Sequence, residues 1–362
     1  MKNNNDLLKI MNLAQRAGAD EVEVFSSTFK SFDTKIENNE LHLSSFSSGT
    51  QVGIRMIKDK RLGFVTTNSL EKNIIGKLIQ EGLEIAKNSP IDKFLRLPVP
   101  KKTKPVKNIY DPETEKLNIK YAISKTEQML KKTKKIDKRI SIDGGGLEIS
   151  ISRDRIVNSK GINLSEDGSI LIYSIMGFGI DGGNVGSFQF AYDAVTSKKD
   201  VNIEKVVDEA AKKILNALGA RPLNKTFKGL VLLTPEAVID LILSPIISSV
   251  NSDNVQKGIS YFKKKLGKKV APDFLNIIDD GTKPGKIGSS SFDREGMPHK
   301  KIHLIKDGIL KTFLYNTYTA GKAKKQSTGS ATGGPTAIPR IGTTNIYIKA
   351  GKRDRKQIIK EI

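Results

Sequence analysis

The sequence predicts an α+β fold made of two helix–antiparallel-sheet–helix units followed by a mostly β C-terminal domain. Three observations lead to this prediction. Stripes of apolar residues at helical spacing flank runs in which apolar and polar residues alternate. This order occurs twice, although the residues of the two copies are not obviously alike. The last third is rich in glycine and in short alternating runs, which are typical of turns and short strands.

The first unit covers 1–89. Its opening helix, 6–17, carries an apolar stripe and ends at Gly18, because glycine readily adopts the left-handed conformation that follows a helix. Alternating runs from "EVEVF" to "LGFVTT" follow and predict several strands. A second helix is expected after Asn68, which would cap it with Glu71 three residues further on.

A linker is predicted over 90–112. This segment carries five prolines between Pro90 and Pro112. Proline fixes its own backbone angle and lacks an amide donor, so such a segment is expected to be extended and to lie between domains.

The second unit covers 113–222. A helix is expected over 115–134, and alternating runs from "RISIDG" to "SFQFAYDAVTS" predict the strands that follow it. An apolar stripe over 203–218 predicts the helix that closes the unit.

The C-terminal domain covers 223–362. It begins with "GLVLL" (229–233), predicted as a buried strand that leads into a helix capped by Thr234, with Pro235 at the first helical position. The later runs "LNIIDDGT", "KIHLIKDGIL", "KTFLYNT" and "TTNIYIKAG" are predicted as short strands.

Composition narrows the class of protein. The chain has 362 residues, of which 37% are hydrophobic and 28% charged, and it has no cysteine, which excludes disulfides and thiolate metal sites. It has neither a signal-peptide pattern nor an apolar run long enough for a bilayer, so a cytoplasmic location without a membrane partner fits best. The net charge of +22 comes from lysines spread over the whole chain. The basic clusters lack interleaved aromatic residues, so nucleic-acid binding is the minority interpretation.

His299 and His303 are the first candidates for a metal site. Alternation from Pro298 to Asp307-Gly308 predicts a hairpin rather than a helix. Strand residues four apart lie about 13 Å from each other, whereas the nitrogen ligands of zinc lie about 2 Å from the ion. Both histidines are therefore predicted to be ordinary strand residues, and no metal site is expected in this chain.

Asp293 and Glu295 precede Gly296 in a predicted turn. Two such carboxylates can perform acid–base chemistry or bind calcium. More often they accept hydrogen bonds from turn amides, and this interpretation is favoured. The polar segment 327–335, "STGSATGGP", is predicted to be a flexible loop whose amides could hold an extended ligand.

Common catalytic motifs are missing. The sequence contains no G-x-S-x-G elbow and no Walker loop. Its glycine-rich turns "DGGNVG" and "DGGGLE" lack the strand–loop–helix context that binds phosphates.

An ordered set of stretches resembles the TldD/PmbA family over almost the whole chain. "GADEVEVF" and "GTQVGIRMIKDKRLGFVTTN" are similar to its N-terminal signature. "LNIIDDGTKPGKIGSSSFDREGMPHKKIHLIKDGIL", then "STG", "PR" and "TTNIYIKAG", are similar to its C-terminal domain. The resemblance implies a peptidase system, also named modulator of DNA gyrase and implicated in peptide maturation and antitoxin turnover.

The zinc-bearing TldD-type subunit of this family carries H-E-x-x-x-H and a later cysteine ligand. The similar stretch here is "VLLTPEAVIDLI". Glu236 matches the motif interior, whereas Pro235 and Asp240 occupy the two histidine positions. Proline offers no ligand atom, and one carboxylate cannot replace two imidazoles and a thiolate. The resemblance is therefore to the metal-free PmbA/TldE-type subunit, with zinc expected only in a TldD-type partner.

The family usually continues beyond "NIYIKAG" with more glycine-rich strands, whereas this sequence stops at Ile362. Either the chain is naturally short or the sequence is incomplete. Missing strands would expose edges that a partner chain could cover.

The resulting prediction is a non-catalytic subunit of a cytoplasmic TldD-type metallopeptidase complex that acts on unfolded peptides. It would pair with a TldD-like subunit or with itself, and would bind peptide by strand addition. An autonomous peptidase with an unrecognised site and a basic nucleic-acid-binding or gyrase-associated protein are the alternatives. The residues predicted to contact peptide are Asp293, Glu295, Gly296, Ser327, Thr328 and Gly329.

Overall fold

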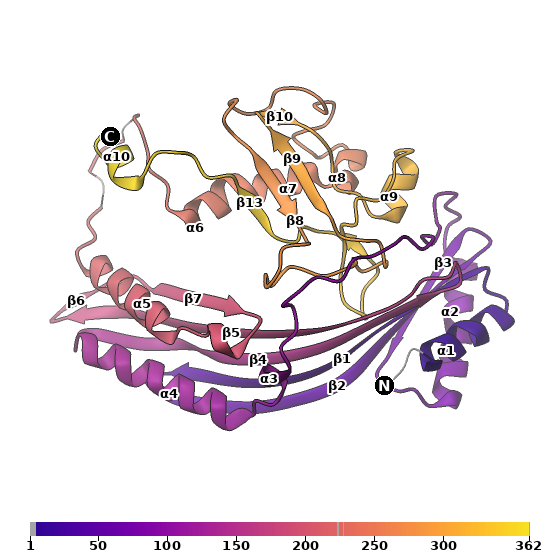
Figure 1. Ribbon diagram of the computed structural model, residues 1–362, viewed down its shortest axis with the longest axis horizontal. Helices are drawn as coiled ribbons and strands as arrows, with labels where there is room; N and C mark the ends of the chain where they lie inside the picture. The colour runs from indigo at the N-terminus through magenta and orange to yellow at the C-terminus, as the bar shows by residue number, and fades with distance from the viewer. Residues whose placement is uncertain (1–4, 223, 227, 362) are drawn as a thin grey trace.

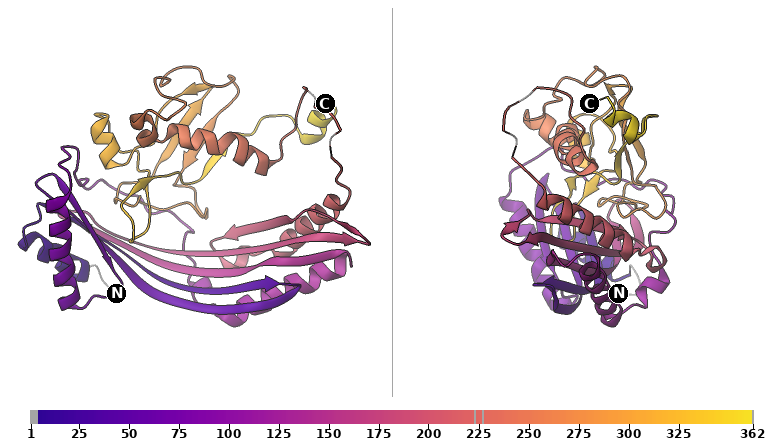
Figure 2. Two further views of the ribbon diagram at one scale, coloured as in Figure 1. Left: turned by 180° about the vertical axis from the view of Figure 1, so that it is seen from behind. Right: turned by 90° about the vertical axis from the view of Figure 1, so that its left-hand side faces the viewer.

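The computed structural model describes residues 5–222, 224–226 and 228–361. The positions outside these ranges include 223, the predicted start of the C-terminal domain. The predicted α+β class is confirmed: helices and a long bowed sheet carry a C-terminal domain on the concave side of the sheet (Figure 1). Figure 2 shows the same arrangement from behind and from one end.

Seven antiparallel strands of the described residues form one sheet, in the order β3-β2-β1-β4-β5-β6 with β7 paired to β5. Their bounds are β1 (Glu21–Glu37), β2 (Glu40–Lys58), β3 (Arg61–Thr67), β4 (Ile140–Asn158), β5 (Asn163–Asp181), β6 (Asn184–Val185) and β7 (Gln189–Val195). β1 pairs with β4 over eleven residues of register, from Glu23↔Asn158 to Asp33↔Glu148. The strands of the two predicted units are thus joined into a single sheet, with β1 and β4 at the junction.

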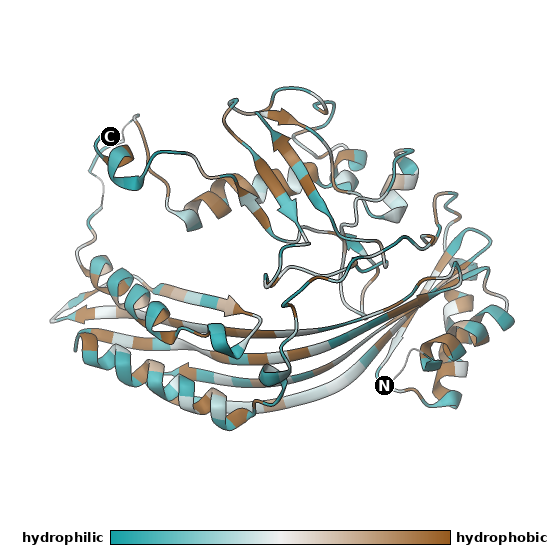
Figure 3. Ribbon diagram, in the orientation of Figure 1, coloured by the Kyte–Doolittle hydropathy of each residue, from teal (hydrophilic) through white to brown (hydrophobic). Residues whose placement is uncertain are grey.

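The face of the sheet opposite the C-terminal domain is covered by helices. These are α1 (Asn5–Arg16), α2 (Lys72–Asn88), α4 (Ile119–Ile136) and α5 (Ile203–Leu218), with the short α3 (Pro112–Glu115) and η1 (Lys198–Asp200) beside them. Figure 3 shows hydrophilic and hydrophobic residues side by side on α4 and α5, as expected for amphipathic helices packed on a sheet. No helix in the described part of the chain is both long and apolar enough to cross a membrane.

The helices on the large sheet agree with the sequence prediction except in one cap. Asn68 does not cap α2, because the N-cap position is Glu71, which makes no side-chain capping bond. Thr234 does cap its helix, since its side chain accepts a hydrogen bond from the amide of Ala237, and Pro235 occupies the first turn.

Strand alternation assigns the two faces of the sheet. On β1, Val22 and Val24 point into the apolar cluster formed with α1 and α2. Glu23 and Phe25 consequently point to the opposite, concave face. Gly53 on β2 also faces that side, and a Cβ atom there would overlap the carbonyl oxygen of Pro335. Glycine is therefore needed where the C-terminal domain rests directly on the sheet.

The predicted linker is extended, but it is bonded to both parts of the molecule. The amide of Leu97 donates to Glu21 at 2.7 Å. The carbonyl of Lys107 accepts from Gly285 at 3.1 Å, and the carbonyl of Ile109 accepts from Ser169 at 3.0 Å. The segment therefore acts as a strap that holds the C-terminal domain over the sheet.

The C-terminal domain combines a four-stranded and a two-stranded sheet with short helices, so it holds more helix than its sequence predicts. Its strands are β8 (Ile277–Asp280), β9 (Lys301–Lys306), β10 (Ile309–Leu310), β11 (Ala331–Thr332), β12 (Arg340–Ile341) and β13 (Ile346–Ile348). Its helices are α6 (Pro235–Val238), η2 (Ile239–Leu243), α7 (Ser244–Val250), α8 (Ser252–Lys257), α9 (Thr317–Lys322) and α10 (Arg355–Ile359).

Two of the strand predictions for this domain are wrong. "GLVLL" (229–233) forms no strand, and Leu230 is 70% exposed. Its apolar run predicts a buried segment, but no described segment covers it. "KTFLYNT" (311–317) forms only an isolated bridge between Leu314 and Asn251. Its apolar residues pack into the domain core without a strand partner on either side.

Candidate functional site

The candidate site is a cleft between the concave face of the sheet and the C-terminal domain. Its cavity has a volume of about 320 Å³. Ser150, Ser152 and Asp154 of β4 form its floor, because strand residues two apart share a face. Its roof comes from residues within 286–294 and 331–333. This interdomain cleft brings together segments that are far apart in the chain.

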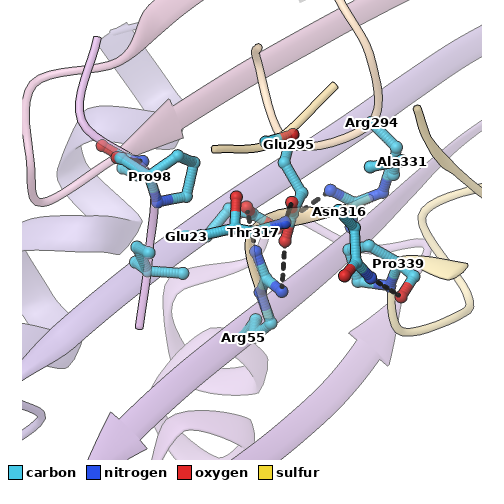
Figure 4. Close-up of polar contacts among 12 residues, drawn as sticks. Glu23, Arg55, Pro98, Arg294, Glu295, Asn316, Thr317, Ala331 and Pro339 are labelled. Carbon is cyan, nitrogen blue, oxygen red and sulfur yellow. Dashed lines mark hydrogen bonds and ion pairs between the residues drawn. The ribbon is translucent and has the colours of Figure 1, made fainter. Parts of the chain in front are cut away.

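Four buried charged side chains join the sheet to the C-terminal domain beside the cleft (Figure 4). Arg55 on β2 donates to Glu23 on β1 at 2.6 Å and to Glu295 at 3.2 Å. Arg294 donates to the other carboxylate oxygen of Glu23 at 2.8 Å. These side chains are at most 8% exposed. Two positive and two negative charges compensate each other, which is the condition for keeping ions buried.

Arg294 extends from this network to the wall of the cleft. Its guanidinium carbon lies 4.0 Å from the centre of the Phe25 ring, and the residue lines the cavity. Its Nη2 atom has no hydrogen-bond partner, although the side chain is only 2% exposed. A buried donor without an acceptor costs about 1–3 kcal/mol, and more when it is charged. A ligand oxygen that accepted this bond would therefore bind favourably.

Carboxylates face one another across the strands of the floor. Asp154 on β4 lies opposite Glu166 on β5, and Asp33 on β1 lies opposite Glu148 on β4. Burial raises the pKa of Asp154, and burial together with Asp33 raises the pKa of Glu148. Glu166 is engaged by Ser291, whose amide donates to it at 2.9 Å. The floor is thus locally acidic in a strongly basic chain.

Asp293 accepts hydrogen bonds from backbone amides, as the favoured interpretation predicts. Its Oδ1 accepts from Glu295 and Met297, and its Oδ2 accepts from Ala331, each at 2.9 Å. Burial, with the charge of Glu295, raises the pKa of Asp293 to about 7. Its carboxylate would be a fifth charge beside a network that is already balanced. Asp293 lines the cleft, so its role in peptide binding stays a prediction.

Glu295 and Gly296 lie behind the cleft wall. Glu295 accepts from the amide of Thr317 at 2.7 Å in addition to its bond with Arg55. Gly296 has a φ of +77°, and a Cβ there would contact Ile162 of the sheet domain. The turn geometry therefore requires glycine and sets how closely the two domains approach.

Ser327, Thr328 and Gly329 form a well-bonded turn rather than the flexible loop expected from composition. The hydroxyl of Thr328 accepts from the amide of Tyr315 at 2.8 Å, and Ser327 donates to the Tyr315 carbonyl at 3.2 Å. The carbonyl of Gly329 lies 2.8 Å from Nδ1 of His299. These residues thus position the His299 ring, which lines the cleft.

The two candidate histidines lie in different environments. His303 is exposed on β9, whereas His299 precedes β9 and is largely buried. Burial lowers the pKa of His299, which favours its neutral form. Among the described residues, no group of three or more His, Asp or Glu side chains is arranged to hold a metal ion.

Pro235, Glu236 and Asp240, which occupy the positions of the family's zinc motif, have surroundings that do not resemble a metal site. Glu236 on α6 is bound by Lys213 of α5, with 2.9 Å between Nζ and Oε1. This hydrogen bond lowers the pKa of Glu236 to about 2, so the side chain is held as a carboxylate. Pro235 begins the helix, and Asp240 is exposed on η2. The donor set at these positions does not fit a zinc ion.

Sequence analysis did not identify Glu23, Arg55 or the carboxylates of the floor. Glu23 in "EVEVF" and Arg55 in "VGIRMI" occupy the polar positions of alternating strands. Such positions ordinarily face solvent. The sequence signal at both positions is a charged residue between two apolar residues of a strand. That signal alone does not reveal that another domain covers this face.

Models of one protein family match three successive parts of the chain. Residues 22–86 match PmbA/TldA metallopeptidase domain 1, residues 110–218 match the PmbA/TldA metallopeptidase central domain, and residues 226–362 match the PmbA/TldA metallopeptidase C-terminal domain. The three matches follow the division into sheet halves and C-terminal domain.

Individual relatives and a solved structure are also similar to this chain over most of its length. An uncharacterized protein of Methanocaldococcus jannaschii is 27% identical, with 96% of this chain and 79% of the relative covered. A metalloprotease of the same organism is 28% identical, with 93% of this chain and 74% of the relative covered. The crystal structure of TldE from Thermococcus kodakarensis superposes with a TM-score of 0.86 at 24% identity, covering 99% of this chain and 80% of that one. At that identity the superposition shows a shared fold.

Proposed function

Because this chain belongs to the PmbA/TldD metallopeptidase family, we propose that it is a non-catalytic, PmbA/TldE-type subunit of a TldD-type metallopeptidase acting on unfolded peptides. Its interdomain cleft forms one wall of the path that admits the peptide. The zinc that performs the hydrolysis is supplied by the TldD-type subunit, and the complex works in the cytoplasm.

The donor chemistry of "TPEAVID" carries this proposal. Pro235 has no ligand atom, and Asp240 offers one carboxylate where the family motif has a second histidine. Glu236 is held by Lys213 as a carboxylate, with its pKa lowered to about 2 by that hydrogen bond. A general base for hydrolysis needs a water molecule to activate and a pKa closer to the working pH. Glu236 therefore serves as an interdomain contact.

The polar lining of the interdomain cleft supports peptide binding. Its floor presents the hydroxyls of Ser150 and Ser152, and its roof presents short loop segments around Ala331. An extended peptide can bond to such a surface through its main chain. Asp293, Glu295 and the turn Ser327–Gly329 fix the position of the roof residues that face the peptide.

Exposed apolar side chains near α6 support a partner subunit. Leu230 is 70% exposed and Leu241 is 62% exposed. Phe190 on β7 is also exposed, and Lys213 connects it to α6, because Nζ lies 5.9 Å from the Phe190 ring and 2.9 Å from Glu236. Large exposed apolar patches are typical of protein–protein interfaces. This patch is the proposed contact with a TldD-like subunit or with a second copy.

Co-purification followed by elemental analysis tests the proposal. The chain is expected to purify with a TldD-type subunit of its own organism, and the complex is expected to contain zinc only in proportion to that subunit. The chain purified alone should contain no stoichiometric zinc after dialysis against zinc-containing buffer. One zinc ion per chain would contradict the non-catalytic assignment.

A further inference from the structure

On the basis of this proposed function, we infer that the peptides bound in the interdomain cleft carry positively charged side chains, which are recognised by carboxylates on the concave face of the sheet. The acidic track consists of Asp33, Glu148 and Asp154. It begins on the open part of the sheet and ends inside the cleft, where Asp154 lines the cavity.

The track follows one strand. Glu148 and Asp154 are six residues apart on β4, so they share its concave face with Ser150 and Ser152 between them. Asp33 lies directly opposite Glu148 on β1. All three carboxylates are half-buried, which strengthens their interaction with a bound charge relative to fully solvated groups.

The three carboxylates form no close ion pair within the described part of the chain, although the charges of Arg294 and Arg155 act against the burial that raises the pKa of Asp154. Among the described residues, no lysine or arginine nitrogen forms an ion pair within 4.0 Å with Asp33, Glu148 or Asp154. The chain has 61 basic and 39 acidic residues, so cations are in excess almost everywhere else. Like charges directly opposite each other in a sheet are destabilising. The track therefore retains an unfavourable arrangement that a bound cation would relieve.

The unpaired donor of Arg294 provides a second indication of a ligand at the same place. Its side chain is 2% exposed, it lines the cavity together with Asp154, and its Nη2 atom lacks an acceptor. A metal cation would satisfy Asp154 and leave Arg294 unpaired, whereas a simple anion would do the reverse. A polypeptide with a basic side chain offers both groups, since its backbone carbonyl can accept from Arg294 while its side chain reaches Asp154.

The geometry of β4 predicts the spacing of the charges. Six strand residues span about 20 Å at about 3.3 Å per residue. An extended peptide has the same rise, so a peptide lying along β4 contacts both Glu148 and Asp154 when its cations are about six residues apart. Cations three residues apart would point to opposite sides of the peptide, because successive side chains alternate.

Fluorescence anisotropy with labelled peptides tests this inference, using the full chain alone and in complex with a TldD-type subunit at about 0.15 M salt. All peptides share an uncharged Ser/Thr/Ala background of about twelve residues. They carry two lysines six apart, two lysines three apart, two glutamates six apart, or no charge. The first peptide is expected to bind at least about fivefold more tightly than each of the others. Since the protein has a net charge of +22, general electrostatics predicts the opposite preference for charge.

The carboxylates are tested with matched amide variants. Glu148→Gln and Asp154→Asn should each remove most of the preference for the six-apart dilysine peptide and leave binding of the uncharged peptide unchanged. Glu204→Gln, on the opposite side of the sheet in α5, is the control and should retain the full preference. Melting temperatures establish that each variant is folded, and Glu148→Gln should not lower this temperature because it removes a like-charge contact.

Each outcome separates the inference from the proposed function. Equal affinity for all four peptides, or tighter binding of the glutamate peptide, overturns the acidic track and leaves peptide binding intact. Unchanged preference in both amide variants also overturns it. If neither the chain nor the complex binds any peptide, peptide binding in the cleft is contradicted together with the inference.

Discussion

Arg55 on β2 and Glu295 in the C-terminal domain form a buried ion pair at 3.2 Å, although 240 residues separate them in the chain. Glu23 and Arg294 complete the network. This contact fixes the C-terminal domain onto the concave face of the sheet. It therefore determines how the roof of the interdomain cleft sits above its floor.

Replacing Glu295 by glutamine should destabilise the protein by about 3–5 kcal/mol. Arg55 and Arg294 would then depend on a single buried carboxylate, Glu23. The glutamine carbonyl can still accept from the amide of Thr317, so the loss reports the missing charge. The free energy of unfolding from urea denaturation measures the effect.

The matched control is Glu204→Gln, which removes one carboxylate of an exposed ion pair with Lys132. It should cost less than about 1 kcal/mol. Equal losses in the two variants would show that the buried network does not hold the domains together.

Because burial raises the pKa of Asp293, the free energy of unfolding should fall as the pH rises. Its pKa in the folded protein is about 7 because of burial and Glu295, against an ordinary value of 3.8. Between about pH 4 and 7 the folded state therefore holds a proton that the unfolded state has released, so folding is weakened as pH increases through this window. Comparison with Asp293→Asn isolates the effect: the stability of the natural protein minus that of the variant should be larger at pH 5 than at pH 8.

Urea denaturation of both proteins at several pH values measures that difference. Asp273→Asn, which removes a carboxylate at an exposed position, is the control variant. A difference for Asp293→Asn that stays constant or grows with pH would show that Asp293 does not hold its proton in the folded state.

Two glycine-to-alanine substitutions should change the free energy of unfolding in opposite directions. Gly329 has a φ of +71°, and a Cβ there would overlap the carbonyl oxygen of Pro298, so Gly329→Ala should destabilise by more than about 1 kcal/mol. Gly76 lies within α2 with open space around its Cβ position, so Gly76→Ala should stabilise by about 0.5–1 kcal/mol. Thermal unfolding of both variants measures this. A stable Gly329→Ala protein would indicate that the turn beneath His299 is adaptable.

Glu236→Gln should leave the peptide-cleavage rate of the complex unchanged. Glu236 binds Lys213 on the surface between α5 and α6 and has no role in hydrolysis under the proposed function. Because the side chain is 45% exposed, the cost in stability should stay below about 1 kcal/mol. The same substitution at the matching glutamate of the TldD-type subunit should abolish cleavage. Loss of activity from Glu236→Gln in a complex that still assembles would assign Glu236 a catalytic role.

Local patterns sufficed to predict the parts of the fold that are set locally. The apolar stripes of α1, α4 and α5 and the start of α6 at Thr234 and Pro235 depend on neighbouring residues, and they were predicted correctly. The pairing of β1 with β4 was not predicted, because strand pairing across more than a hundred residues leaves no local pattern.

Of the candidate site, the sequence predicts only the residues that lie in turns. The hydrogen bonds of Asp293 follow from its position before Gly296, and they were predicted. Glu23, Arg55 and Glu148 alternate with apolar residues in the same way as solvent-facing side chains do. Glu23 and Arg55 are buried only because the C-terminal domain lies over them, and no single segment of the sequence encodes the position of that domain.

The rate of peptide cleavage by this chain alone, compared with its rate in complex with a zinc-bearing TldD-type subunit, tests the central claim most directly. The account predicts no cleavage by the chain alone even when zinc is added, and faster cleavage by the complex than by the TldD-type subunit alone. Metal-dependent cleavage of an unfolded peptide by the purified chain alone would contradict it.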